Sequence, residues 1–364
     1  MSCELRGKPS DDLTPPQPSP ASGEGAEGVD TQVKNLTFRF AILIGVAALA
    51  LATLLSLALG AYPISISKLF AGELTAQDWS ILTGLRAPRV LAACAGGAAF
   101  ALSGAALQAL FRNPLADPGL LGVPAAAGLG AAIALIVVGA GAALWIGALG
   151  GAAIATSAML VAARRGAHSA SLGGSTSTLL LLGIAINAAC AAGLAMLTAL
   201  ASEGQLKTLS FWMLGSFASL TWTQVLMMCA VAIVAAIALQ ANANALGALA
   251  LGERTARSVG VDLRRVRFRV AVVTTAAVAV VTAFCGGVGF VGLAAPHLAR
   301  LMVGASPRKV LPLAALIGAL LCVLADVIAR SIAPPTELPV GAITAILGVP
   351  LLVMMVLRGG GRIQ

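Results

Sequence analysis

The chain has 364 residues, of which 59% are hydrophobic and only 10% are charged. An ordinary soluble domain has roughly 25% charged residues, so this composition excludes one. The apolar segments have helical length and lack the roughly ten-residue alternating pattern of an outer-membrane barrel, which predicts an all-α polytopic membrane protein. The formal net charge of +9 is distributed between apolar segments, which indicates membrane topology and not a nucleic-acid-binding face.

The N-terminal tail, residues 1–34, is rich in Pro, Ser, Gly and acidic side chains and lacks the apolar core of a signal peptide. We expect this tail to be disordered and residues 35–364 to form one transmembrane domain.

The six cysteines show no C-x-x-C spacing. They are expected to be small hydrophobic residues, not metal ligands or disulfide partners.

Hydropathy and helix-breaking residues predict about ten transmembrane helices. The expected ranges are 38–60, 90–111, 119–140, 142–163, 178–200, 222–240, 270–285, 288–303, 311–329 and 338–357. The seventh and eighth are short and separated by glycines, so they are either two helices or one broken element. In the second, Gly97, Ala101 and Ala105 recur every four residues, a spacing that favours close helix packing in lipid.

The basic residues predict the direction of the crossings. A cytoplasmic N-terminus places sixteen lysines and arginines inside and five outside, with two more in the tail, as the positive-inside rule requires. The inside set is Lys34, Arg39, Arg112, Arg164, Arg165, Arg254, Arg257, Arg264, Arg265, Arg267, Arg269, Arg300, Arg308, Lys309, Arg358 and Arg362. The outside set is Lys68, Arg86, Arg89, Lys207 and Arg330. Both termini are therefore expected in the cytoplasm.

The loop after the second predicted helix reads Arg112-Asn-Pro-Leu-Ala-Asp-Pro-Gly119. Its two prolines stop the helix, and Asp117 is placed to cap the helix that follows, so the loop alone is a tight cytosolic turn.

Other blocks occur along the chain in a fixed order: Arg86-Ala-Pro-Arg89, Ser103-Gly104-x3-Gln108, Trp212-x2-Gly215-Ser216, Leu251-Gly252-x7-Gly260, Gly289-Phe290-x-Gly292-Leu293-x2-Pro296-His297-x2-Arg300, Asp326-x3-Arg330 and Glu337-Leu-Pro-Val-Gly341-x6-Gly348-x-Pro350. Together they resemble the permease subunits of iron-complex and cobalamin ABC importers, the FecCD-type family, over about residues 38–358.

The resemblance implies a transport subunit of the bacterial inner membrane that carries an iron-siderophore, haem or cobalamin. It implies a second copy of this chain, two ATPase subunits and a periplasmic or surface substrate-binding protein as partners, besides membrane lipid and without nucleic acid. The chain contains no G-x-x-x-x-G-K-[ST] loop, so we expect no ATPase activity and no cofactor in this subunit. ATP and Mg²⁺ would then belong to the partner ATPase.

The resemblance assigns roles to residues near the helix ends. It implies that Arg86, Arg89 and Arg330 hold acidic residues of the binding protein. The alternatives are interfacial anchoring and, for Arg330, an i, i+4 pair with Asp326. In the cytosolic segment 248–269 it implies a short helix that docks in a groove of the ATPase, and the alternative is a solvated basic loop. The residues expected in this coupling role are Gly252, Glu253, Arg254, Ala256, Arg257 and Gly260.

The resemblance also implies a set of residues along the translocation path. These residues are Asn113, Leu115, Thr176 and Ser177, and Asn187, in the middle of the fifth predicted helix, is expected to face the same path. Turn and cap roles are the alternatives for the residues at helix ends, and a bond to a neighbouring helix is the alternative for Asn187.

Two other function classes fit the sequence less well. An ion-coupled secondary transporter would place ionisable residues at mid-membrane, whereas nearly every charge here lies at a helix end, with Asp326 the nearest exception. An intramembrane enzyme would need paired histidines or a Ser/His/Asp set, and the sequence shows neither.

His297 has no second ligand at metal-binding spacing. A helix-dipole role suffices to explain Glu337.

Overall fold

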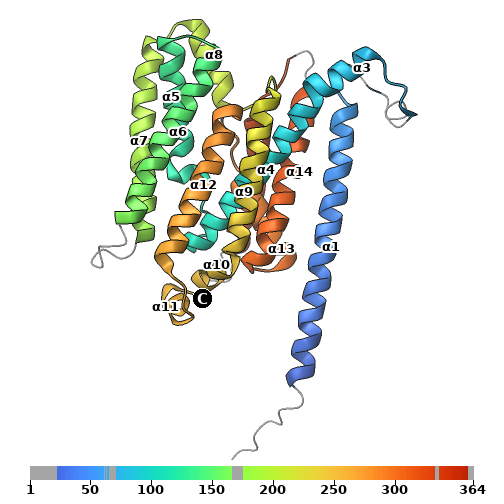
Figure 1. Ribbon diagram of the computed structural model, residues 1–364, viewed down its shortest axis with the longest axis vertical. Coiled ribbons are helices and arrows are strands. Elements are labelled where there is room, and N and C mark those ends of the chain that lie inside the picture. Colours follow the sequence, from blue (N-terminus) through green and yellow to red (C-terminus); the bar gives the residue numbers. More distant parts are fainter. Residues whose placement is uncertain are drawn as a thin grey trace, which may run out of the picture.

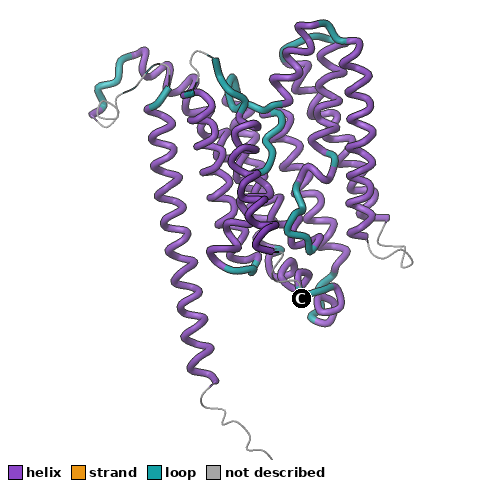
Figure 2. The backbone as a smooth tube through the Cα atoms, turned by 180° about the vertical axis from the view of Figure 1, so that it is seen from behind, coloured by secondary structure: helices purple, strands orange, loops and turns teal. Residues whose placement is uncertain are grey.

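The computed structural model describes residues 23–60, 62, 64, 71–165, 175–332 and 336–359, and this part of the chain consists of helices and loops (Figure 2). The long helices are α1 (Gly23–Ala58), α4 (Ala87–Phe111), α6 (Ala142–Arg165), α7 (Ser175–Leu200), α9 (Trp222–Ala241), α12 (Leu263–Cys285), α14 (Pro307–Ser331) and α15 (Val340–Gly359). The shorter ones are α3 (Ala76–Ile81), α5 (Val123–Val137), α8 (Glu203–Met213), α10 (Ala243–Ala250), α11 (Glu253–Ser258) and α13 (Val291–Val303). A π-helical turn η2 (Leu82–Arg86) and a 3-10 turn η3 (Pro118–Leu121) complete the order.

The helices form two groups side by side (Figure 1). Helices α5, α6, α7 and α8 lie together, α4, α9, α13 and α14 form the other group, α12 packs against both, and α1 stands at the edge against α14. Helices α10 and α11 and the start of α1 lie at one end, and α3 and α8 lie at the other (Figure 1). Following the predicted orientation, we call these the cytosolic end and the outer end.

Each of the ten predicted segments coincides with a separate helix in the structure, so the seventh and eighth segments are two helices. In the described part of the chain, seven helical segments are long and apolar enough to cross a membrane, and three shorter apolar helices accompany them. The all-helical membrane fold is confirmed. The number of ten crossings stays a prediction.

Several predicted boundaries were wrong for local reasons. Helix α5 begins at Val123 and not at residue 119, because Pro118–Leu121 forms a 3-10 turn that ends at Gly122 with φ 76°. Helix α12 begins at Leu263 and not at residue 270, because Asp262 accepts a hydrogen bond from the backbone N–H of Arg265 at 3.1 Å and starts the helix among the arginines. Helix α1 begins at Gly23, so residues 23–34 of the tail are helical, whereas residues 1–22 lie outside the described residues.

Helices α3, α8 and α10 were missed because hydropathy selects long apolar segments. The first two are polar and begin in capping boxes, in which Thr75 pairs with Asp78 and Ser202 pairs with Gln205. A capping box satisfies two backbone N–H groups at the start of a helix, so it stabilises short helices that have little apolar surface.

Glycines let α4 pack at the centre of its group. A methyl group on Gly97 would overlap the carbonyl oxygen of Gly318 in α14, and one on Gly104 would overlap that of Gly292 in α13. A methyl group on Gly318 would in turn overlap the Cβ of Ala101, which confirms the close packing predicted from the four-residue spacing. Backbones that approach this closely gain dispersion contacts, which drive helix association where lipid removes the hydrophobic contribution.

We predict that Gly104→Leu prevents α4 from packing on α13. Because the leucine would meet backbone and not a movable side chain, we expect a loss of at least about 3 kcal/mol in stability and little monodisperse protein after detergent extraction. The matched control is Gly150→Leu, since a methyl group at Gly150 of α6 meets nothing within 4 Å. Equal yields and equal melting temperatures for the two variants would contradict this packing.

Candidate functional site

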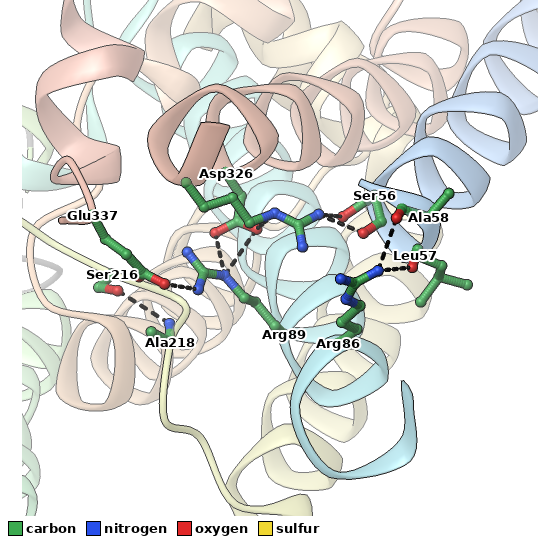
Figure 3. A network of polar contacts seen from close by, with 10 residues as sticks. Ser56, Leu57, Ala58, Arg86, Arg89, Ser216, Ala218, Asp326 and Glu337 are labelled. Atoms are coloured by element: carbon green, nitrogen blue, oxygen red, sulfur yellow. Dashed lines mark hydrogen bonds and ion pairs between the residues drawn. The ribbon is translucent and has the colours of Figure 1, made fainter. Parts of the chain in front are cut away.

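The outer ends of α1, α4 and α14 meet in a network of buried arginines (Figure 3). Arg86 donates from Nη1 to the carbonyl oxygens of Leu57 at 2.5 Å and Ala58 at 2.9 Å. Arg330 donates from Nη2 to the carbonyl oxygen of Ser56 and, at 2.6 Å, to its Oγ. The last carbonyls of a helix have no partner within it, so these two arginines cap α1 and fasten it to the bundle.

Arg89 joins two acidic residues in the same network (Figure 3). Its Nε donates to Asp326 Oδ1 at 2.8 Å and Oδ2 at 3.0 Å, and its Nη1 donates to Glu337 Oε1 at 2.7 Å. Arg330 Nε lies 3.7 Å from Asp326 Oδ2, so the i, i+4 pair given as the alternative for Arg330 is present. One carboxylate that is only 1% exposed therefore lies between two guanidinium groups.

The structure brings the three outer arginines together, as predicted, but directs their charge inward. Arg86 is 5% exposed and Arg89 and Arg330 are each 9% exposed. Their partners lie within the chain, so they act in this structure as cross-links between helices. Glu337 belongs to this network, although the sequence suggested only a helix-dipole role for it.

The cytosolic turn between α4 and α5 is folded by its own side chains. Asn113 Oδ1 accepts a hydrogen bond from the backbone N–H of Leu115 at 2.9 Å, and the Leu115 side chain is exposed. Asp117 Oδ1 accepts from the backbone N–H of Gly119 at 2.7 Å, which confirms the predicted cap. Burial raises the pKa of the Asp117 carboxyl, and the hydrogen bond from Gly119 opposes that rise.

Asn187 fastens this turn to α7. Its Nδ2 donates to the carbonyl oxygen of Gly119 at 3.1 Å, so the structure shows the bond to a neighbouring element. Thr176 and Ser177 lie in the first turn of α7, and their side chains lie outside the described part of the chain. Asn113 and Leu115 thus lie in the turn after α4, whereas Asn187 lies in the middle of α7 and reaches Gly119, and their role in a path stays a prediction.

The predicted coupling segment, residues 248–269, contains the end of α10, the whole of α11 and the first turns of α12. Gly252 precedes α11 with φ 127°, a conformation that favours glycine, and Gly260 follows it with φ 80°. We call residues 243–260, which contain α10 and α11, the bracket. The Glu253–Arg267 ion pair attaches it to α12, the Ala256 methyl group is buried, and the side chains of Arg254 and Arg257 are exposed.

Two exposed apolar side chains beside α11 were missed in the sequence. Leu251 is 77% exposed and Val259 is 66% exposed, and they flank α11. Large apolar side chains exposed outside the spanning helices mark a contact surface when they lie together. The polar composition of the segment concealed them, since each is a single apolar residue next to a glycine turn at Gly252 or Gly260.

The described residues contain no group of three or more His, Cys, Asp and Glu side chains that could hold a metal ion. The five described cysteines are free thiols. Whether a cofactor binds this chain stays untested.

Comparison with known proteins identifies the family. Residues 48–358 match the model of the FecCD transport family. The hemin transport system permease protein HmuU of Yersinia pestis is 37% identical over 308 residues, which cover 82% of this chain and 90% of HmuU. The vitamin B12 import system permease protein BtuC of Salmonella typhimurium is 40% identical over 317 residues, 84% of this chain and 94% of BtuC.

Solved structures agree with the sequence comparison. A structure described as an inward-facing conformation of a metal-chelate type ABC transporter has a TM-score of 0.77 and 28% identity, covering 87% of this chain and 98% of its own. PsaBC from Streptococcus pneumoniae, with a TM-score of 0.52 and 16% identity over 80% of this chain and 95% of its own, shows the fold alone. The match over residues 48–358 and the two permease relatives place this multi-pass membrane chain in the FecCD transport family.

Proposed function

We propose that this chain is the permease subunit of an ABC importer that carries an iron chelate, haem or cobalamin inward across the bacterial inner membrane. The observation that carries the proposal is the family match over residues 48–358, which includes almost the whole helical bundle. Relatives that carry hemin and vitamin B12 support this substrate class.

The complex that we propose contains two copies of this chain, two ATPase subunits and one substrate-binding protein. The bracket of α10 and α11 would contact the ATPase through Leu251, Val259, Arg254 and Arg257. Exposed apolar and basic side chains on one short helical element are suited to a groove in a partner. ATP and Mg²⁺ would bind in the ATPase subunits alone.

Docking of the binding protein at Arg86, Arg89 and Arg330 is part of the proposal. The network carries three arginines against two carboxylates, so its outer end has an excess positive charge. An acidic partner would compete for Arg89 with Glu337, whose side chain is 44% exposed and therefore displaceable.

An ion-coupled mechanism would need an ionisable group that is available within the membrane. Asp326, the acidic residue nearest to that description, is held between Arg89 and Arg330. Its oxygens are engaged by these two guanidinium groups, so the carboxylate is not available to bind a transported ion. The geometry therefore supports the ATP-driven proposal over the secondary-transporter alternative.

Uptake into proteoliposomes tests the proposed function. Vesicles with the permease, its ATPase and a loaded binding protein should accumulate cargo with ATP, and an ionophore that collapses ion gradients should leave the rate unchanged. Haem, cobalamin and a ferric siderophore are compared side by side to identify the cargo. Vesicles that contain the permease alone are the control. Uptake that needs an ion gradient but no ATP would contradict the proposal.

A further inference from the structure

A cavity of about 180 Å³ with both apolar and polar walls lies at the cytosolic end of the bundle. It is bounded by the last turns of α4, the end of α10 and the connection between α13 and α14, and its polar lining is Gln108, Arg112, Asn113 and Arg300. The cavity is large enough for several water molecules, each of which occupies about 30 Å³ in the liquid.

Two arginines line the cavity without carboxylate partners. Neither Arg112 nor Arg300 forms an ion pair within the residues that the structure describes, whereas Arg89, Arg257, Arg265, Arg267 and Arg330 all do. Arg300 is half-buried, and Arg112 is exposed at the rim. A guanidinium group that loses part of its hydration without gaining an anion is unfavourable, so this cavity favours an anionic ligand.

Arg300 is held in place by a buried amide. Gln108 accepts a hydrogen bond from Arg300 Nη2 with its Oε1, and donates from Nε2 to the carbonyl oxygen of Gly292 at 3.3 Å. The side chain of Gln108 is buried and bonded at both of its polar atoms, so it fixes the guanidinium orientation. The remaining Arg300 donors have no protein partner among the described residues, and the side chain lines the cavity.

The N-terminus of α14 adds a third positive feature. Pro307, its first residue, lines the cavity, and the N-cap residue Ser306 makes no side-chain capping hydrogen bond. The N-terminus of a 25-residue helix carries a partial positive charge from the aligned peptide dipoles. Two guanidinium groups and the positive end of the α14 dipole approach one cavity from separate elements, and guanidinium forks match the acceptor oxygens of a phosphate group.

We propose that this cavity binds a phosphate group at the cytosolic boundary of the membrane. The apolar lining includes Ala105 and Leu311, which are buried, whereas Arg300 is half-buried and Arg112 is exposed. An apolar lining beside more exposed guanidinium groups is compatible with an anionic phospholipid headgroup. Soluble phosphate can reach the same guanidinium groups. Occupancy would join α4, α13 and α14 next to the bracket that contains α10 and α11.

Binding to the full-length permease tests the proposal with two probes. Inorganic phosphate is titrated in detergent while the melting temperature is followed, with chloride at equal ionic strength as the reference. In parallel, phosphatidylglycerol retained from mixed phosphatidylcholine nanodiscs is quantified by mass spectrometry. Stabilisation by phosphate identifies a soluble ligand, and selective retention of phosphatidylglycerol identifies a lipid headgroup.

The variants separate the cavity from general surface charge. Arg112→Gln with Arg300→Gln should lower the observed binding at least tenfold, and Arg112→Gln alone, at an exposed position, should lower it several-fold without disturbing the fold. Arg264→Gln with Arg269→Gln removes two exposed arginines of α12 that do not line the cavity and should bind as the wild type does. If neither probe binds the wild type, or if both double variants lose binding equally, the proposal is overturned.

Discussion

Replacing Asp326 by asparagine should be among the most destabilising single changes in this protein. The substitution would leave Arg89 and Arg330 close together in a buried site without the carboxylate that lies between them. Breaking a buried ion pair by removing one partner costs about 3–5 kcal/mol, because the remaining charge stays desolvated. Arg89 Nη2 and Arg330 Nε already lack hydrogen-bond partners, so the site has no spare acceptor. Thermal unfolding of the purified permease measures the loss.

Glu337→Gln is the matched control, since it removes one negative charge from the same network. The Glu337 side chain is 44% exposed, so water compensates for most of the lost interaction and the expected destabilisation is about 1 kcal/mol or less. Equal shifts in melting temperature for the Asp326 and Glu337 variants would contradict the burial argument.

The same control variant tests docking. If the binding protein contacts Arg89, removing the competing carboxylate of Glu337 should increase the affinity of the binding protein for the permease several-fold at low salt, and the increase should shrink as salt rises.

Arg86→Glu together with Arg89→Glu should weaken docking of the binding protein. The melting temperature of that variant must be compared with the wild type, because both arginines are also cross-links. Unchanged affinity in both variants would remove the arginines from the interface.

The spanning helices were predictable because their signal is local. Long apolar segments predicted α1, α4, α6, α7, α9, α12 and α14, and the four-residue spacing from Gly97 predicted the packing of α4. The capping role of Asp117 was also local, since a side chain and a backbone N–H two residues apart define it.

The polar networks were less predictable because their partners are distant in sequence. Arg89 and Glu337 are 248 positions apart, and no spacing rule joins them before the helices are packed. Arg300 and Gln108 are 192 positions apart, so the cavity between α4 and α13 had no signal in either segment. The sequence placed the three outer arginines at one end of the bundle and offered Asp326 as a partner of Arg330, but it gave no indication of the partners of Arg86 and Arg89 within the chain.

Glu253→Gln should uncouple ATP hydrolysis from transport. Glu253 begins α11 and pairs with Arg267 in the second turn of α12, so this ion pair joins the bracket to a long membrane helix. The Arg267 side chain is only 10% exposed and that of Glu253 is 27% exposed, so solvent screens the pair weakly. Movement that an ATPase imposes on α11 would reach α12 through this contact and through the buried Ala256.

We expect the variant complex to hydrolyse ATP while uptake per ATP falls on the order of tenfold, which corresponds to about 1.4 kcal/mol of lost coupling. The matched control is Asp262→Asn, because Asp262 pairs with Arg265 in the same loop and the two side chains are 51% and 76% exposed. That pair has no partner in another helix, so its loss should leave uptake per ATP unchanged. If both variants uncouple equally, general charge in the loop is responsible, and if neither does, Ala256 and the backbone transmit the motion without the ion pair.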